Sequence, residues 1–457
     1  MKIARPVSTA LVLVALACTE QREGEATPLR PPTSILWVTI DTIRADHLGA
    51  YGYFRNTSPR FDALAEESLL FERSLAPIAT TLPSHLSALT ATYPNEHGVL
   101  SNIDAGGKIF VPSEKLVSLA GFLAERGYAT AAFVSATPLK SWSGIQRGFN
   151  HYDTPAAEAR AGDETTNHAI AWLKHHADAP FFLWVHLFDP HHPHEPPTGI
   201  KPFRSDYRLD RYLAARRFSD SATTKLGVQM DTRDEINAYD GEILFADQQL
   251  GRLIDAVRHS GSADNVSIVV MGDHGEGMAQ HDMLFHGHVW GEQLHVPLLM
   301  HVPGEPARRI SQPMSIVDTF PTLLGMIEIP DEAQYLMDIS GIDVLSAPDE
   351  SRTIFSQSSM RLTKWGVPLT YALTSKDWKY TSASNGERHL YDLRADPFEL
   401  EDLSDSLPDA VSRFQAMVDE RVALQLDRNA RIGGTKIEQI DETLINDLRA
   451  LGYVDEE

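Results

Sequence analysis

Four residues from three distant segments of this sequence have side chains that together could bind a divalent metal ion: Asp41, Thr81, Asp273 and His274. Two carboxylates, a hydroxyl and an imidazole form a mixed oxygen and nitrogen ligand set. The histidine makes this set better suited to Zn²⁺ or Mn²⁺ than to Ca²⁺ or Mg²⁺. An ion touching the threonine oxygen would lower the pKa of the hydroxyl and make an alkoxide accessible near neutral pH. We therefore expect Thr81 to be both ligand and nucleophile.

A loop dense in histidine and proline, HLFDPHHPHEPP, supplies a second group of candidates directly after an apolar run. Its histidines could bind substrate oxyanions, protonate a leaving group or supply a second metal site. The alternative is a surface loop stiffened by prolines. We expect His191 to be catalytic and His194 to bind substrate, with Asp189 as a candidate ligand of a second ion.

The segment MGDHGEGMAQHDMLFHGH adds three more histidines after Asp273 and His274. His281 fits a solvated loop. We favour His286 and His288 as second-site ligands or substrate contacts, and we assign a catalytic role to the former and substrate binding to the latter.

The segment Thr80–Gly98 must position the threonine. An apolar pattern at helical spacing begins just after Pro83, and Ser84 is the expected N-cap. Thr81 then lies in the turn that leads into a helix N-terminus. Unpaired N–H groups and the positive end of the helix dipole suit a bound oxyanion there.

Apolar runs that end in acidic residues must position the other ligands. The runs are Ile35–Ile40, Pro180–Phe188 and Val266–Met271, and Asp41, Asp189 and Asp273 follow them. Continuous apolar runs are typical of strands buried on both faces. Helical patterns alternate with these strands, which predicts an α/β fold with a largely parallel sheet flanked by helices. Because ligands bind beyond the carboxyl ends of such strands, we expect the acidic residues to share one site.

The remaining pattern predicts helices over 59–71, 116–125, 164–177, 233–259 and 315–326, and strands over 128–135 and 296–302. After about residue 345 the pattern changes to strands over 370–384 and 388–393 around the turn Asn385-Gly386, followed by helical segments over 408–424 and 437–453. We expect a catalytic domain over 35–345 and a smaller subdomain over 346–457.

The N-terminus has the pattern of an export signal. A short basic region precedes the apolar run Val7–Ala17, which is too short to span a bilayer comfortably, and Cys18, the only cysteine of the chain, follows it. This pattern resembles a bacterial lipoprotein signal with a lipid-anchored Cys18; the alternative is an ordinary signal peptide. We expect a signal over 1–18, a polar tether over 19–34 and a lipoprotein anchored in a membrane, facing the periplasm or cell surface.

The charge balance limits the partners. With 63 acidic against 40 basic residues, the net charge is −23, which argues against a nucleic-acid partner. The arginine-rich stretch Thr198–Met230 is the expected specificity insert. Its arginines could favour an anionic substrate or form a solvated surface.

Together these segments resemble the sulfatase family of the alkaline phosphatase superfamily. The resemblance spans about Ile35–Leu403 and rests on the strand before Asp41, the Pro-Ser turn into a helix, the His-Pro loop, Gly272-Asp273-His274-Gly275 and LYDLRADPFELEDL at 390–403. It implies a mixed α/β domain with a small C-terminal antiparallel sheet. It also implies the metal ligands named above and an anionic ester substrate.

The sequence departs from the sulfatase pattern at the nucleophile. Sulfatases carry Cys/Ser-x-Pro-x-Arg, whose first residue is oxidised to formylglycine, whereas this chain has Thr81-Leu82-Pro83-Ser84-His85. Oxidation of a threonine hydroxyl gives a ketone, so the aldehyde cannot form. Thr42 stands where a second Asp is frequent, and His85, which we expect to bind substrate, replaces the Arg. A threonine at this position resembles the phosphodiesterase, phosphonate hydrolase and transferase branches of the superfamily.

We therefore expect a metal-dependent hydrolase of phosphate, phosphonate or sulfate esters. The alternatives are an arylsulfatase that works without formylglycine, a phospho-group transferase and a non-catalytic binding lipoprotein.

Overall fold

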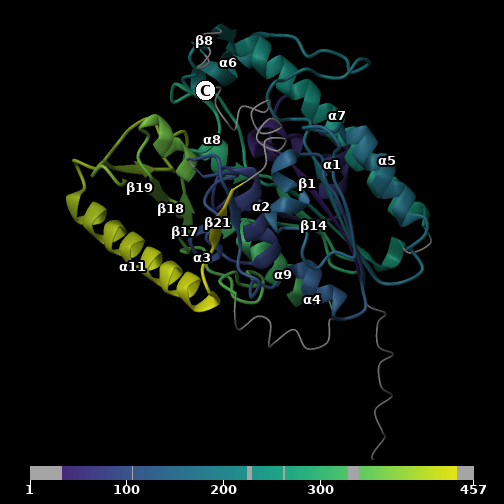
Figure 1. Cartoon of the computed structure of the whole chain (residues 1–457). Coiled ribbons are helices and arrows are strands. Elements are labelled where there is room, and N and C mark those ends of the chain that lie inside the picture. The colour runs from purple at the N-terminus through teal and green to yellow at the C-terminus, as the bar shows by residue number, and fades with distance from the viewer. Residues whose placement is uncertain (1–32, 105, 224–228, 261–262, 328–338, 440–457) are drawn as a thin grey trace, which may run out of the picture. The chain divides into compact units, whose positions relative to one another are not determined.

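A mixed eight-stranded sheet in the order β15-β2-β14-β10-β1-β7-β5-β6 forms the centre of the fold (Figure 1). The structure, a computed structural model, describes residues 33–104, 106–223, 229–260, 263–327 and 339–439. The strands of the central sheet are β1 (Ser34–Ile40), β2 (Leu69–Phe71), β5 (Ala129–Phe133), β6 (His151–Asp153), β7 (Phe181–Leu187), β10 (Val266–Gly272), β14 (Leu298–His301) and β15 (Arg308–Ile310). The run from β10 to β6 is parallel, and β14 pairs antiparallel with both of its neighbours. The predicted largely parallel sheet is confirmed.

Side chains of β1 alternate between two hydrophobic cores, because successive residues of a strand point to opposite faces. Ile35 and Trp37 enter one core, and Leu36 and Val38 enter the other. The first core contains residues of α2 (Thr81–Thr90), α4 (Leu119–Ala124) and α9 (Thr319–Met326). The second contains residues of α1 (Pro59–Ala65), α5 (Gly162–Leu173), α6 (Tyr207–Ala215) and α7 (Thr232–His259). Helices therefore cover both faces of the sheet, as Figure 1 shows.

The register of the central strands brings their carboxyl ends to one row. Ile40 of β1 pairs with Gly272 of β10 on one side and with Leu187 of β7 on the other. The residue that follows each strand therefore lies at the same edge of the sheet. Gly272 cannot be replaced without a shift, because an added Cβ would come within 2.8 Å of the Ile43 side chain.

A four-stranded antiparallel sheet follows, in the order β17-β18-β19-β20. Its strands are β17 (Ile354–Gln357), β18 (Thr370–Thr374), β19 (Trp378–Ala383) and β20 (Arg388–Asp392). The predicted Asn385-Gly386 turn joins the last two, and Gly386 has a φ of +100°, which glycine adopts without strain. The helix α11 (Pro408–Ile432) contributes Val418 to the core beneath this sheet. The small C-terminal antiparallel sheet is thus confirmed.

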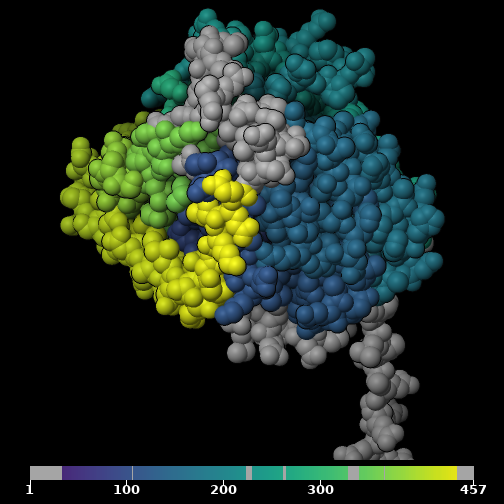
Figure 2. All heavy atoms as spheres, viewed as in Figure 1, coloured from purple at the N-terminus to yellow at the C-terminus, as the bar shows by residue number. Residues whose placement is uncertain are grey.

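The C-terminal strand β21 (Lys436–Glu438) returns to the N-terminal half of the chain and pairs with β4 (Ile109–Val111). Figure 2 shows this yellow segment lying against blue residues. The remaining elements are β3 (Ser74–Leu75), α3 (Pro94–His97), β8 (Ser221–Thr223), β9 (Gln229–Asp231), β11 (Gly277–Gln280), β12 (Met283–Phe285), α8 (Gly291–Leu294), β13 (His295–Val296) and β16 (Met314–Ser315).

Several predicted boundaries are wrong. Ser84 is not the N-cap of α2: the helix begins at Thr81, because Pro83 is tolerated in a first turn, where N–H groups have no helical partner. Phe71 lies in a strand rather than a helix, and the predicted strand over 370–384 is two strands. The predicted signal, Cys18, the tether up to residue 32 and residues 440–453 lie outside the described residues. Within the described ranges, no helix is both long and apolar enough to cross a membrane.

Candidate active site

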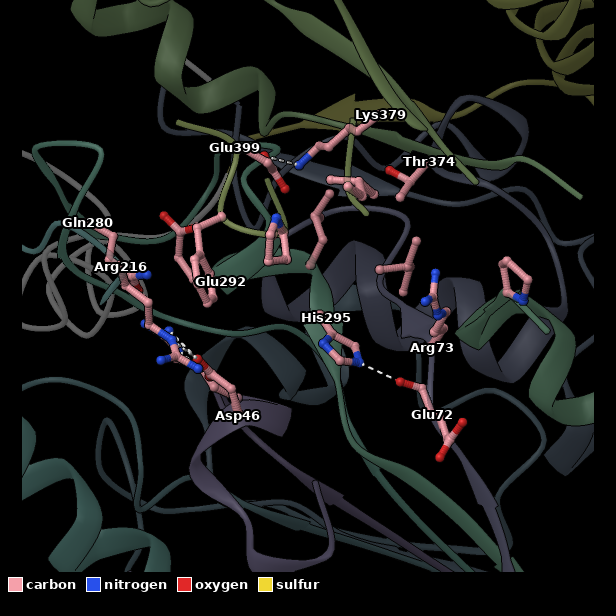
Figure 3. A pocket seen from close by; sticks show the side chains of 18 of the residues that line it. Asp46, Glu72, Arg73, Arg216, Gln280, Glu292, His295, Thr374, Lys379 and Glu399 are labelled. Carbon is pink, nitrogen blue, oxygen red and sulfur yellow. Dashed lines mark hydrogen bonds and ion pairs between the residues drawn. The ribbon is translucent and has the colours of Figure 1, made fainter. Parts of the chain in front are cut away.

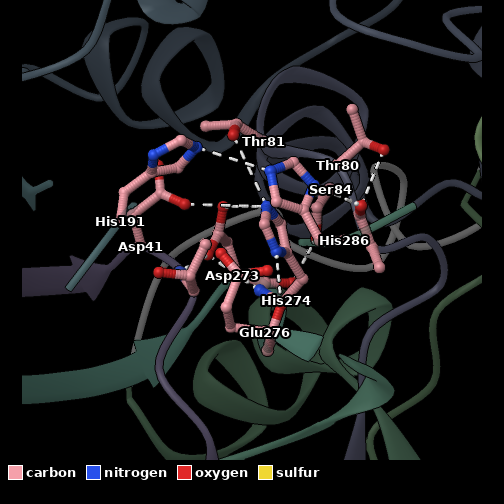
Figure 4. A network of polar contacts seen from close by, with 12 residues as sticks. Asp41, Thr80, Thr81, Ser84, His191, Asp273, His274, Glu276 and His286 are labelled. Atoms are coloured by element: carbon pink, nitrogen blue, oxygen red, sulfur yellow. Dashed lines mark hydrogen bonds and ion pairs between the residues drawn. The ribbon is translucent and has the colours of Figure 1, made fainter. Parts of the chain in front are cut away.

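Asp41, Asp273 and His274 meet at the edge of the sheet where β1 and β10 end (Figure 4). The Nε2 atom of His274 lies 3.6 Å from Oδ1 of Asp41, 3.4 Å from Oδ2 of Asp273 and 3.5 Å from Oγ1 of Thr81. Ligand atoms bound at about 2.1 Å in a tetrahedron lie about 3.4 Å apart. The distances from His274 Nε2 to the other three predicted ligands therefore match the spacing around one divalent ion.

Hydrogen bonds fix the orientation of each ligand. His274 Nδ1 donates to the carbonyl of Gly275 at 3.0 Å, so its Nε2 keeps a free lone pair toward the site. Asp273 Oδ1 accepts the backbone N–H groups of Thr42 and His274. Asp41 Oδ2 lies 3.2 Å from Nε2 of His186. In each carboxylate one oxygen is thus held by the protein, which directs the other toward the common centre.

The oxygens that face the centre have no protein partner. Asp41 Oδ1 and Asp273 Oδ2 are buried and accept no hydrogen bond. Burial raises the pKa of Asp41, and burial together with the neighbouring Asp41 raises the pKa of Asp273 well above its usual range. Burial lowers the pKa of His274 to about 3, which keeps its lone pair available. Two such carboxylates are costly to ionise without a cation, so the residues fit a divalent ion.

Thr81 is the first residue of α2. Three hydrogen bonds hold the first turn of this helix in place. The Asn102 side chain accepts the N–H of Leu82 at 2.9 Å. Ser84 Oγ donates to the carbonyl of Asp273 at 2.6 Å, which ties the first turn of the helix to the end of β10. His85 Nδ1 donates to the carbonyl of Thr81 at 2.8 Å. The hydroxyl therefore lies at a helix N-terminus, whose dipole favours negative charge on it.

The structure gives His85 a positioning role in place of the expected contact with substrate. The residue is buried, and its Nε2 accepts a hydrogen bond from Thr39 Oγ1 at 2.9 Å. Trp184 Nε1 donates to the same hydroxyl. Both ring nitrogens of His85 are thus engaged with the protein, so the side chain holds the Thr81 backbone in place.

His191 and His286 face one another across the site (Figure 4). Their Nε2 atoms are 3.4 Å apart, and the Nδ1 atoms donate to the carbonyls of His192 and Ala79. The ring of His286 lies 4.4 Å from the ring of His274. Burial lowers the pKa of His191 to about 4 and that of His286 well below its usual range. Two facing lone pairs favour a proton shared between them, which is the arrangement of a general acid–base pair. The catalytic role of these histidines stays a prediction.

Three other predicted site residues lie outside the ligand cluster of Asp41, Asp273 and His274. Asp189 accepts the N–H of Gly162 at the start of α5 and does not belong to the ligand cluster, because the chain turns away after β7. The Nδ1 atom of His194 contacts Glu235, and its Nε2 atom donates to the carbonyl of Pro190, so both ring nitrogens face protein groups. His288 lies between β12 and α8, and its N–H donates to Gln293.

Sequence reasoning missed two buried groups around the ligands. His186, inside β7, holds Asp41, and burial lowers its pKa to about 3. A histidine in an otherwise apolar strand was the signal for it. Glu276 is labelled beside His274 in Figure 4, and burial raises its pKa well above the usual range. His281 is not a solvated loop residue, since it bonds to Glu292 and stacks on Trp290.

A separate pocket of about 320 Å³ lies between residues of the segment 44–313 and residues of the segment 374–399, which includes strands of the C-terminal sheet (Figure 3). Charges in its wall are paired: Lys379 bonds to Glu399 at 2.6 Å, and Arg44 bonds to Asp46 at 2.9 Å. None of the residues predicted for the active site lines this pocket. The ligand cluster at the strand ends is therefore the stronger candidate for chemistry.

Comparison with known proteins identifies the family of the chain. The family model described as Sulfatase matches residues 33–329. An ulvan-active sulfatase of Formosa agariphila is 25% identical over 438 residues, which cover 87% of this chain and 82% of the relative.

Two solved structures share the fold. The phosphonate monoester hydrolase of Agrobacterium radiobacter has a TM-score of 0.68 and 20% identity, covering 87% of this chain and 96% of its own. A protein solved with its substrate D-glucosamine-2-N,6-O-disulfate has a TM-score of 0.69 and 19% identity, covering 88% of this chain and 100% of its own. Sulfatases generally depend on a divalent metal ion, and the cluster described above provides candidate ligands. The chain belongs to the sulfatase family, and it is an ester hydrolase.

Proposed function

We propose that this protein is a metal-dependent hydrolase of phosphate or phosphonate esters, with Thr81 as the nucleophile. The observation that carries the proposal is the position of Thr81 Oγ1 at the N-terminus of α2, 3.5 Å from a His274 nitrogen that also faces two unpartnered carboxylate oxygens. The ion held by Asp41, Asp273, His274 and Thr81 would lower the pKa of the threonine hydroxyl and offset the charge of an ester oxyanion.

The residues of the chain divide the remaining work. The helix N-terminus and the anchored His85 hold the Thr81 hydroxyl toward the ester. Thr81 Oγ1 forms the bond to phosphorus as the bond to the leaving oxygen breaks. The pair of His191 and His286 takes up the hydroxyl proton and delivers it to the leaving oxygen. Water then cleaves the threonine ester, which releases the acid and restores the hydroxyl.

The chemistry of threonine favours phosphorus over sulfur. A formylglycine hydrate expels sulfate by collapsing to an aldehyde, and a threonine ester has no equivalent route. Hydrolysis of sulfate esters without formylglycine is the second candidate, because the relatives include an ulvan-active sulfatase and a fold neighbour was solved with a sulfated sugar. Transfer to an acceptor alcohol is a variant of the same first step. The complete ligand cluster argues against a non-catalytic protein.

One experiment separates these candidates. Purified protein of known metal content is assayed with aryl phosphate monoesters and diesters, phosphonates and sulfates, with and without an alcohol acceptor. We expect turnover of a phosphorus ester, and a phosphorylated Thr81 peptide in acid-quenched samples. Turnover of sulfates alone would overturn the proposal, and products that contain the acceptor would assign a transferase.

Residues 1–34 support a proposal for the location of the protein. We propose that the chain is exported and anchored by a lipid on Cys18, with the catalytic domain over 35–345 and the subdomain over 346–457. Metabolic labelling with a fatty acid, compared between the natural chain and Cys18→Ser, tests the anchor.

A further inference from the structure

A second cluster of metal-ligating side chains lies outside the candidate active site. His192 and His194, which follow β7, face Glu235 in the first turn of α7. Glu235 Oε1 lies 2.6 Å from Nδ1 of His194 and 3.3 Å from Nδ1 of His192. One ligand atom from each residue lies within 4.8 Å of the other two. The three side chains thus converge on a common point.

The hydrogen bonds of His194 show why a cation fits there. Its Nε2 lies 3.1 Å from the carbonyl of Pro190, and a carbonyl only accepts, so this nitrogen carries the ring proton. In the neutral ring, Nδ1 then presents a lone pair to the Glu235 carboxylate. At 2.6 Å these two atoms share a proton. An ion that displaces this proton would separate them to about 3.4 Å, the spacing of two tetrahedral ligands. A histidine whose second nitrogen donates to a backbone carbonyl is the usual arrangement for metal ligation.

The cluster is closed to solvent on one side and partly exposed on the other. The side chain of His194 is 1% exposed, that of Glu235 is 15% exposed and that of His192 is 28% exposed. The ring centroids of His192 and Phe285 are 4.9 Å apart, and the planes of the His192 and His194 rings meet at 88°. An ion can therefore enter beside His192 while His194 and Glu235 form the closed side.

We propose that His192, His194 and Glu235 form a second divalent-metal site. This site is distinct from the cluster of Asp41, Thr81, Asp273 and His274. Two imidazoles and one carboxylate suit Zn²⁺ or a similar transition-metal ion, whereas Ca²⁺ and Mg²⁺ prefer oxygen ligands. Three protein ligands leave a fourth position open to water or to a substrate oxygen.

Two contacts connect this site to the active site. The Pro190 carbonyl that accepts from His194 also accepts from Thr42 Oγ1 at 2.8 Å, and Thr42 N–H donates to Asp273. The carbonyl of His192 accepts from His191 Nδ1 at 2.6 Å. An ion in the second site therefore fixes the loop that carries His191. The site itself does not depend on the chemistry proposed for Thr81.

Metal counting tests the proposal. The full chain is stripped with a chelator, dialysed against Zn²⁺ and analysed by elemental mass spectrometry. We expect two ions per chain in the natural protein, one in Glu235→Gln and in His192→Ala, and two in Thr81→Ala. His175→Ala, which removes an exposed histidine, is the matched control and keeps two ions.

A spectroscopic measurement covers the case in which a variant does not fold. Co²⁺ titrated into the stripped natural protein should give two saturating steps in its visible absorption, and Asp273→Asn should lose one of them. Circular dichroism confirms that each variant is folded. One ion per chain in the natural protein, or two ions that persist in folded Glu235→Gln, would overturn the second site without affecting the role of Thr81.

Discussion

The imidazole of His274 presents its unprotonated Nε2 to the hydroxyl of Thr81 at 3.5 Å, at a point where neither residue is exposed to solvent. The two residues come from different parts of the chain, the segment that follows β10 and the first turn of α2, and the Ser84 hydroxyl joins these parts through the carbonyl of Asp273. The position of the nucleophile is therefore set by tertiary hydrogen bonds rather than by a flexible loop.

Removal of the Thr81 hydroxyl should abolish catalysis while leaving the metal site in place. We expect Thr81→Ala to lower kcat/KM by about 10³-fold or more, because the nucleophile and its covalent intermediate are lost. Thr81→Ser, which keeps the hydroxyl, should retain measurable turnover. Steady-state rates together with metal content check this; full activity in folded Thr81→Ala would refute the assignment.

Removal of metal should make stability depend on pH in a defined direction. Burial raises the pKa of Asp41 from 3.8 to about 7 in the metal-free protein. A raised folded pKa means that the proton stabilises the fold at low pH, and this stabilisation is lost as pH rises through about 7. We expect the melting temperature of chelator-treated protein to fall between pH 5 and pH 8, and added metal to restore it.

The same melting curves for Asp41→Asn provide the control. An amide does not titrate, so the pH-dependent loss should shrink in this variant. Equal losses in both proteins would show that other groups cause it.

The effect of His191 should depend on the leaving group. If this histidine protonates the leaving oxygen, His191→Ala harms esters of poor leaving groups far more than aryl esters. We expect about a 10²-fold to 10⁴-fold loss in kcat for an alkyl ester and a smaller loss for a nitrophenyl ester. A plot of log kcat against leaving-group pKa should be steeper for the variant. Parallel plots would assign the residue to substrate binding.

The buried carboxyl of Glu242 should make the folded protein less stable at alkaline pH. Burial raises its pKa to about 9, while its Oε1 accepts the N–H of Glu195 and its Oε2 has no partner. The protonated form stabilises the fold below pH 4.5, and the contribution disappears as pH rises through about 9. Glu242→Gln imitates the protonated side chain, so it should melt at a higher temperature than the natural protein at pH 9. At pH 5 the two should agree.

The exposed Glu420 supplies the comparison for this measurement. Glu420→Gln should leave the melting temperature unchanged at both pH 9 and pH 5. An identical gain in both variants at pH 9 would point to net charge rather than to the buried carboxyl.

Much of the fold could be predicted because many of its strands and helices have a local pattern of apolar residues that is typical of the element. The buried run before Asp41 and the 28-residue α7 were found close to their observed bounds. Ser84 was misplaced because its hydroxyl serves a tertiary bond to Asp273, which local capping rules cannot reveal.

The site was predictable in part for the same reason. Asp41 and Asp273 follow strands that share a register, so the expectation of one shared edge was correct. Asp189 follows a neighbouring strand, yet its carboxylate binds the start of α5, since direction after a strand end depends on the turn. The contact of His194 with Glu235 could not be foreseen, because the two residues lie 41 positions apart in the sequence.

The bond from Thr42 to Asp273 spans 231 positions of the chain. No fragment that ends before β10 contains the carboxylates of both Asp41 and Asp273. An ion bound by these two residues therefore cannot guide the early stages of folding. The two halves of the central sheet must find one another first, and contacts of such long sequence separation form slowly. If the cluster binds an ion, metal loading would therefore be a late maturation step, and a ribosome-bound or truncated chain should be as inert toward the ion as toward the ester.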